Sequence, residues 1–194
     1  MDGLILIDKP ENITSFGAVA KIRKLVCQKR VGHTGTLDPM ATGVLPILIG
    51  RATSLSPFLL ESDKIYTAKI KFGLKTDSFD ITGNITYKAD EKTLKKINEQ
   101  EILKVLKHFT GAIKQTPPMF SALKKNGVPL YKLARQGKSL ELEKRDIFIH
   151  YIKLLKFDET NKECLAEVKA TKGTYIRSLA NDIGEFLGCG AVLK

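Results

Sequence analysis

The sequence predicts a mixed α+β fold from two kinds of hydrophobic pattern. Over Lys64–Phe72, mainly polar residues alternate with aromatic and aliphatic ones, which is the period of a strand with one buried face. Over Gly173–Leu187, apolar residues recur every three or four positions, which is typical of an amphipathic helix, and Gly188 ends it. Runs of strands with helices between some of them indicate an α+β domain, and 194 residues suit one domain with or without an insertion.

In the first third of the chain we expect two buried strands with a helix between them. The strands are Gly3–Ile7 and Val44–Gly50, both short apolar runs. The helix is capped by Thr14 or Ser15 and continues to about Cys27. Its predicted apolar side consists of Phe16, Val19, Ile22 or Ala20, and Val26, and its exterior and tail carry Lys21, Arg23, Lys24, Lys29 and Arg30.

The remaining predicted elements follow from caps, turn residues and periodicity. In chain order they are a short helix at about Ser54–Leu60, the Lys64–Phe72 strand, a polar turn at Thr76–Asn84, a helix at Glu99–Phe109 capped by Asn98, a hairpin at Ser121–Leu130 that turns at Asn126–Gly127, a short helix at Tyr131–Gln136, strands at Ile147–Phe157 and Cys164–Thr171, and the helix that ends at Gly188.

The most unusual stretch is Gly32–Gly43, which contains three glycines and one proline. These residues exclude a helix interior or a regular strand, so we expect a loop held close to the core. The loop carries His33 and one carboxylate, Asp38, which Pro39 biases away from the helical region. An ordinary glycine-rich connection is the simplest interpretation. The run Gly32-His33-Thr34-Gly35 also fits the Gly-x-x-Gly of a KH-type RNA clamp, although the helix pair that such a clamp needs is not evident.

The charge of the chain indicates a polyanionic partner. The formal net charge is +11, and a merely soluble basic surface is the alternative interpretation. The span Ile102–Leu140 contains no acidic residue but eight lysines and arginines, with Phe120 and Tyr131 among them. Basic residues interleaved with aromatic ones fit RNA binding better than membrane binding, because no long amphipathic face accompanies them.

Other functional classes find little support. Cys27, Cys164 and Cys189 are odd in number and lack metal-ligand spacing, so we expect reduced thiols, no metal and no disulfide framework. No Walker motif ends the Gly32–Gly43 loop, and we expect no cofactor. The apolar runs are too short for a signal peptide or a membrane span, so we expect a soluble, cytoplasmic protein.

Asp38 is the best single candidate for chemistry, with Arg177 as its candidate partner. A carboxylate beside a guanidinium stays ionised and oriented. Such a carboxylate acts as a nucleophile or a base at a sugar carbon, as in glycosyl transfer. An aspartate before a proline is also a common turn former, and spacing alone leaves both interpretations open.

Seven motifs follow one another along the chain: Gly3–Pro10, Gly32–Leu45, Ser62–Tyr66, Phe72–Asp80, Met119–Lys124, Leu133–Gly137 and Lys172–Leu179. In this order they resemble the bacterial tRNA pseudouridine-55 synthase family of the TruB type, over essentially the whole chain. The resemblance implies the pseudouridine synthase fold, a curved, mostly antiparallel mixed sheet with flanking helices and a basic RNA cleft.

The resemblance also implies a reaction, the isomerisation of one uridine in the T arm of tRNA to pseudouridine. The target nucleotide is flipped out of its stack. Its N1–C1′ bond breaks, the uracil turns, and a C5–C1′ bond forms, without a cofactor. Asp38 would be the catalytic carboxylate and would act on C1′, on the uracil ring or on the 2′ proton. Tyr66 would pack against the flipped base, Arg177 would pair with Asp38, and His33 would help to hold the T loop open.

Further residues take roles only through the resemblance. Lys9, Lys64 and Asp80 occupy motif positions near the site, and the loop residues Gly32, Thr34 and Gly35 would contact the substrate. The acid-free stretch would be an RNA-gripping insertion at about 114–140, with Lys124, Lys125, Lys132 and Arg135 on it. Residues 1–194 would form the catalytic domain, acting as a monomer and lacking the C-terminal RNA-binding domain that the family carries beyond this point.

Two alternatives stay open. The first is a non-catalytic tRNA-binding or tRNA-folding module that has the same cleft and leaves uridine unchanged. The second is a related synthase that works inside a guide-RNA complex. The second is less favoured, because the Pro39–Gly43 part of the loop resembles the stand-alone bacterial type.

Overall fold

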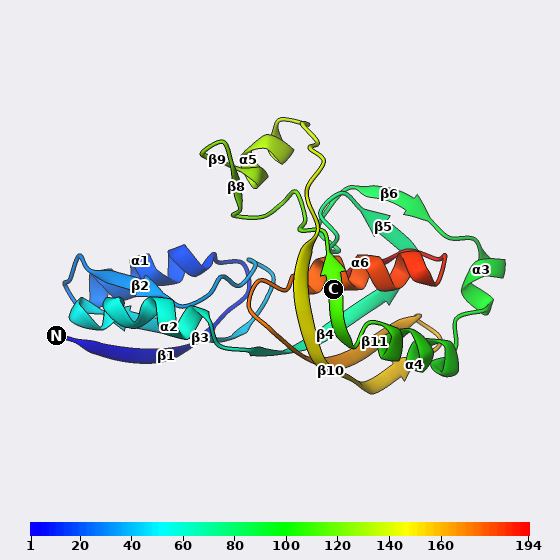
Figure 1. The fold of residues 1–194 in the computed structure, drawn as a ribbon, viewed down its shortest axis with the longest axis horizontal. Helices are drawn as coiled ribbons and strands as arrows, with labels where there is room; N and C mark the ends of the chain where they lie inside the picture. The colour runs from blue at the N-terminus through cyan, green and yellow to red at the C-terminus, as the bar shows by residue number, and fades with distance from the viewer. The chain divides into compact units, whose positions relative to one another are not determined.

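The computed structural model describes residues 1–194, which form two compact units, Met1–Ser62 and Asp63–Lys194 (Figure 1). Each unit combines an antiparallel sheet with helices, so the predicted α+β class is confirmed. None of the helices has the length and apolar content that crossing a membrane requires.

The first unit is a three-stranded antiparallel sheet with the strand order β1-β3-β2. Its elements are β1 (Gly3–Lys9), α1 (Ser15–Leu25), β2 (Val31–His33), β3 (Gly43–Ile49), the 3₁₀ helix η1 (Gly50–Leu55) and α2 (Ser56–Leu60). Helix α1 packs on one face of the sheet. The buried core there consists of Ala18, Val19, Val31, Leu45, Ile47 and Ile49.

Two predictions about this unit are wrong in detail. Phe16, expected on the apolar side of α1, is 64% exposed, and Ala18 lies in the core instead. The buried stripe of α1 is therefore rotated relative to the predicted one. Strand β1, expected to be buried, has Leu4, Ile5 and Leu6 exposed. Leu4 and Leu6 point away from the face that α1 covers, because side chains alternate along an edge strand.

Strand β2 ends opposite a proline of the central strand. His33 pairs with Ile47, and one residue later the Thr34 N–H donates to the Pro46 carbonyl at 3.2 Å. Pro46 has no N–H to donate in return. The ladder therefore stops here, and the chain leaves the sheet into the loop that carries Asp38.

The second unit has a five-stranded antiparallel sheet with the strand order β12-β4-β11-β10-β7. The strands are β4 (Lys64–Phe72), β7 (Gly111–Gln115), β10 (Arg145–Asp158), β11 (Glu163–Ala170) and β12 (Ala191–Leu193). Helices α4 (Glu99–His108) and α6 (Ile176–Phe186) contribute to the same core as the sheet. Residues 68, 70 and 72 of β4 are buried, as the alternation predicts.

Small elements complete the second unit: β5 (Leu74–Thr76), β6 (Ile85–Lys88), α3 (Glu91–Lys95), β8 (Lys124–Lys125), β9 (Val128–Pro129) and α5 (Leu130–Arg135). The predicted hairpin is confirmed, since Asn126 and Gly127 both have positive φ, 51° and 79°, as a primed turn requires. Helix α6 begins at Ile176, later than predicted, because Gly173 adopts a left-handed φ of 78° and starts a turn.

Candidate functional site

In the first unit, Asp38 lies in a loop, and Ser15 binds the residue directly before it, Leu37. The Ser15 hydroxyl accepts a hydrogen bond from the Leu37 N–H at 2.9 Å and donates to the Leu37 carbonyl at 3.2 Å. Ser15 is 2% exposed, and the Leu37 side chain packs against the core of this unit. The peptide group before Asp38 is thus fixed to the first turn of α1.

The residue after Asp38 is held by a buried lysine. The Pro39 carbonyl accepts from the Asn12 N–H at 2.8 Å and from Lys9 Nζ at 3.2 Å. Lys9 is 0% exposed and also donates to the carbonyls of Pro10 and Ile13, at 2.8 and 2.9 Å. Hydrogen bonds on both sides of Asp38 therefore fix its backbone, while its side chain stays half-buried.

The charges of this loop depend on burial. Burial lowers the pKa of Lys9, although the nearby carboxylate of Asp38 opposes the change. Burial also lowers the pKa of His33, whose Nδ1 accepts a 3.4 Å hydrogen bond from the Gly35 N–H. The imidazole of His33 is therefore neutral at physiological pH. Thr34 is buried, while Gly32 and Gly35 are half-buried.

In the second unit, Arg177 forms a buried pair with Asp80. Arg177 Nη1 lies 3.5 Å from Asp80 Oδ2, and the side chains are 5% and 8% exposed. The Arg177 guanidinium also donates to the carbonyls of Ser78 and Phe120, at 3.1 and 2.9 Å. Asp80 Oδ1 accepts from the hydroxyls of Ser78 and Thr82, at 2.9 and 2.6 Å. Arg177 is thus a buried charge in an amphipathic helix, compensated by a carboxylate and two carbonyls.

The beginning of α6 is held by a residue that sequence reasoning missed. Gln115 donates from its amide nitrogen to the Tyr175 carbonyl at 3.1 Å and accepts from the Tyr175 N–H at 2.8 Å. Within the first turn of the helix, the Ser178 hydroxyl donates to the Thr116 carbonyl at 2.8 Å. Gln115 is 2% exposed at the end of β7. The end of β7 thus sets the position of Arg177.

The other predicted catalytic residue of this unit is on β4. Tyr66 is half-buried and lies on the same side of the strand as the buried Ala68 and Ile70. Lys64 lies two residues earlier on the same side and is also half-buried. The structure therefore brings Lys9 close to Asp38 in the first unit, and Arg177 close to Asp80 in the second. His33 lies at the end of β2, in the segment that leads to Asp38. The pairing of Asp38 with Arg177 stays a prediction.

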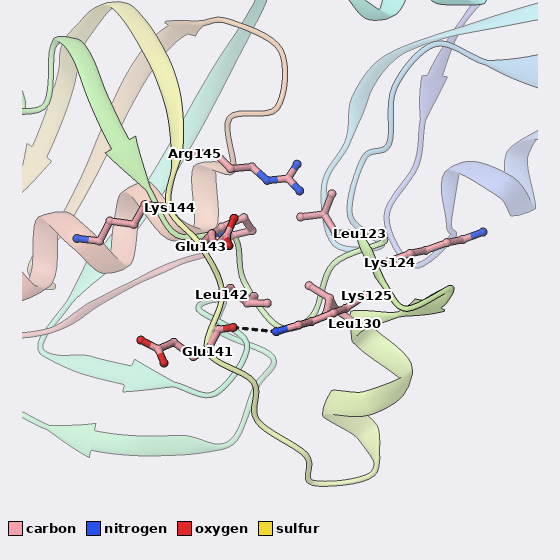
Figure 2. A pocket seen from close by; sticks show the side chains of 10 residues that line it. Leu123, Lys124, Lys125, Leu130, Glu141, Leu142, Glu143, Lys144 and Arg145 are labelled. Carbon is pink, nitrogen blue, oxygen red and sulfur yellow. Dashed lines mark hydrogen bonds between the residues drawn. The ribbon is translucent and has the colours of Figure 1, made fainter.

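The predicted RNA-gripping residues, Lys124, Lys125, Lys132 and Arg135, are all exposed on the β8–β9 hairpin and α5. The Arg135 guanidinium lies 5.5 Å from the centre of the Tyr131 ring. A cavity of about 290 Å³ lies between the hairpin and the returning chain. Figure 2 shows the side chains that line it, among them Leu123, Leu130 and Leu142. Lys125 Nζ donates to the Glu141 carbonyl at 3.3 Å across one side of it. None of the predicted catalytic residues lines this cavity.

Groups that could bind a metal do not gather in this structure. No cluster of three or more His, Cys, Asp or Glu side chains could hold an ion. All three cysteines are free thiols, and burial raises the pKa of Cys164 to about 12.

The chain shares its sequence and its fold with known proteins. A tRNA pseudouridine synthase B of Francisella philomiragia subsp. philomiragia is 48% identical over 193 residues, 100% of this chain and 63% of the relative. The enzyme of the same name from Geobacter sulfurreducens is 47% identical over 194 residues, 100% of this chain and 62% of the relative. The chain thus spans less than two thirds of the length of these curated relatives.

Solved structures agree with the sequence relatives. In a Cbf5–Nop10–Gar1 complex, the matching chain has a TM-score of 0.74 and 32% identity, covering 99% of this chain and 46% of that chain. In an H/ACA RNP bound to a substrate RNA containing 2′-deoxyuridine, the values are 0.70 and 30%, covering 99% and 45%. The predicted pseudouridine synthase fold is therefore confirmed. The family described as TruB family pseudouridylate synthase (N terminal domain) matches residues 23–176, so this chain, which has that fold, belongs to the TruB family of pseudouridylate synthases.

Proposed function

We propose that this chain carries the catalytic centre of a tRNA pseudouridine synthase that isomerises a uridine in the T stem-loop. The observation that carries the proposal is the fixed position of Asp38, whose neighbours Leu37 and Pro39 are bound by Ser15 and Lys9. The identity to relatives named tRNA pseudouridine synthase B is 47–48%, against 30–32% to the Cbf5 and H/ACA structures. This difference favours a tRNA substrate and a stand-alone monomer over a guide-RNA complex.

The proposed reaction needs a carboxylate at a fixed place rather than a cofactor. The N1–C1′ bond of uridine breaks and a C5–C1′ bond forms, C5 loses its proton and N1 gains one, so the product is an isomer. A carboxylate that is already oriented loses little freedom when the substrate binds. Asp38 acts on C1′, on the uracil ring or on the 2′ proton. Each of these roles uses the ionised form.

The other site residues serve the same proposed chemistry. Tyr66 packs against the flipped base and helps to remove the C5 proton. Arg177 pairs with Asp38, and Asp80 orients the same guanidinium. Unstacking the target base costs roughly a few kcal/mol, and His33 replaces part of the lost stacking in the T loop. Lys64, Gly32 and Gly35 contact the nucleotide, and the exposed Lys124, Lys125, Lys132 and Arg135 grip the RNA backbone. Thr34, also expected to contact the substrate, is only 2% exposed and is therefore assigned to the shape of the loop. A cytoplasmic location follows from the tRNA substrate.

The test is tritium release from a T stem-loop whose uridine is labelled at C5. The assay contains only this chain and the RNA. Asp38→Asn removes the ionised carboxylate but keeps the side-chain shape, so we expect turnover to fall by roughly ten-thousand-fold while the fold is kept. Asp146→Asn makes the same charge change at an exposed carboxylate and is expected to leave turnover unchanged.

Two results would contradict the proposal. If Asp38→Asn released tritium at a rate comparable with the wild type, Asp38 would not be the catalytic carboxylate. If the wild-type chain bound the stem-loop with salt-sensitive affinity but released no tritium, the non-catalytic RNA-binding module would be the better account.

A further inference from the structure

The outward face of α1 carries a basic surface that the proposed chemistry does not use. Between Asn12 and Leu37 the chain has no acidic residue but five lysines and arginines. Lys21, Lys24, Lys29 and Arg30 are exposed, and Arg23 is half-buried. None of the five takes part in an ion pair. This is an uncompensated positive surface in the first unit.

The geometry of α1 brings part of this charge onto one face. At about 100° per residue, Lys24 falls opposite the buried Ala18 and Val19, with Phe16 and Lys21 about 70° to either side of that direction. Arg23 lies next to Phe16 on the flank of the helix. Both arginines are already oriented. Arg23 Nη2 donates to the Val31 carbonyl at 3.2 Å, and Arg30 Nε donates to Thr53 Oγ1 at 2.6 Å. The lysines project from the same helix and its tail.

Phe16 lies in the first turn of α1, beside Arg23. Its ring is 64% exposed, and the Arg23 guanidinium lies 5.8 Å from the ring centre. An exposed aromatic ring among basic residues is typical of surfaces that bind nucleic acid, where the ring stacks on a base and the cations contact phosphates. The Phe16 ring is exposed and lies next to cations that have no acidic partners. This arrangement indicates a ligand that has both bases and phosphates.

The helix dipole and membrane binding each explain fewer of these exposed residues than RNA binding does. Basic residues in the last turn of a helix complement its dipole, which accounts for Arg23 and Lys24 but not for Lys21 or Lys29. Membrane binding needs one continuous apolar face. The exposed apolar residues of α1 are Phe16 and Leu25, which are nine positions apart and therefore on opposite sides of the helix. Neither role fits the whole surface.

We propose that the outward face of α1, with Lys29 and Arg30 after it, binds the sugar-phosphate backbone of the RNA substrate. This inference rests on the proposed function and extends it to basic residues of the first unit. Because phosphate contacts position an RNA without reading its sequence, the surface adds affinity and leaves the chemistry unchanged.

The experiment compares two triple variants that remove the same charge. The test variant is Lys21→Gln, Lys24→Gln and Lys29→Gln. The control is Lys92→Gln, Lys95→Gln and Lys96→Gln, on α3 and its C-terminal end, where all three lysines are exposed. Glutamine and lysine have similar helix propensities, so both variants are expected to fold. Binding to an unmodified tRNA transcript is measured between about 50 and 300 mM salt, values chosen to span the range in which phosphate contacts weaken.

We expect the slope of log K against log salt to become shallower by about 2 in the test variant, since each phosphate contact contributes about 0.7 to 0.9. The control is expected to keep the wild-type slope, and both variants are expected to keep the wild-type rate of tritium release at saturating RNA. Equal slopes in the two variants would overturn the inference, because only net charge would then matter. A loss of rate at saturating RNA in the test variant would also overturn it.

The binding measurement is independent of catalysis. If the wild-type chain released no tritium, the proposed function would fail, while the difference in slopes would still decide the role of α1. Vesicles of phosphatidylserine and phosphatidylcholine test the membrane alternative. If the wild type bound them, the test variant did not, and the slope for RNA stayed unchanged, the surface would be assigned to membranes and the RNA assignment overturned.

Discussion

At the scale of single residues, two buried side chains each bind both polar groups of one backbone residue. Ser15 accepts from and donates to Leu37, and Gln115 does the same to Tyr175. One side chain satisfying an N–H and a C=O fixes that residue in both translation and rotation. In both cases the fixed residue is close in sequence to a charged candidate, Asp38 or Arg177. The candidates are therefore positioned through their neighbours' backbone.

Ser15→Ala tests the first of these contacts. The change leaves the Leu37 N–H and C=O without their partner inside the unit, so we expect a loss of about 1 to 3 kcal/mol in the free energy of unfolding. Urea denaturation measures it. Ser54→Ala is the matched control, because the exposed Ser54 hydroxyl binds only the Arg51 carbonyl within η1, at 2.8 Å. Equal losses in the two variants would show that Ser15 does not hold the loop.

At the scale of secondary-structure elements, the sequence predicts those helices and strands that are stabilised by contacts between neighbouring residues. The caps of α1 and α4 are found at Thr14 and Asn98, and the alternation over β4 gives its buried face. These elements are stabilised by hydrogen bonds and periodicity within a few residues. They could therefore be predicted from the sequence.

The elements and contacts that escaped prediction depend on distant partners. Strands β5, β6 and β12 have only three or four residues each, so their own sequence carries little periodicity. Gln115 finds its partner Tyr175 sixty residues away, and Ser15 finds Leu37 twenty-two residues away. Arg177 is buried because Asp80 and the Phe120 carbonyl meet it there. A charge in a helix sequence predicts exposure unless such partners are known.

Gln115→Met tests how the end of β7 positions α6. Methionine has a similar shape but loses both hydrogen bonds to Tyr175, so we expect a loss of about 2 to 4 kcal/mol in the free energy of unfolding. We also expect slower tritium release than the stability loss accounts for, because Arg177 follows two residues later. Gln100→Met, on the exposed surface of α4, is the control for both measurements and is expected to change neither. Normal turnover by the Gln115 variant at a temperature where it is folded would contradict the positioning role.

At the scale of the whole molecule, one half-buried carboxyl on α6 makes stability depend on pH. Burial raises the pKa of Asp182 from 3.8 to about 6, with Lys144 opposing the change and Glu185 adding to it. Because the folded pKa is the higher one, the carboxyl stabilises the fold fully below about pH 4, and this contribution is lost as pH rises through about 6. The shift corresponds to at most about 3 kcal/mol, which solvent screening reduces to about 1 to 2.

Asp182→Asn is therefore expected to be more stable than the wild type by about 1 to 2 kcal/mol at about pH 7.5, and by less at about pH 4.5, values on either side of the transition. Urea denaturation at the two pH values measures the difference. Asp146→Asn, at an exposed carboxylate, is the control and is expected to change stability equally at both. A constant advantage for Asp182→Asn across this range would mean that the carboxyl does not titrate with folding.

The proline in the central strand of the first unit has a consequence for the length of the loop. Pro46 lies outside the run from Gly32 to Gly43, yet its missing donor decides which residue is the last to pair with β3. Successive residues of β3 bond alternately to β2 and β1, so moving that proline by two positions would move the departure point as well. The span between the sheet and Asp38 would then change by two residues, while Ser15 and Lys9 would stay where they are. The missing backbone N–H of one residue on β3 thus determines how many residues separate β2 from Asp38.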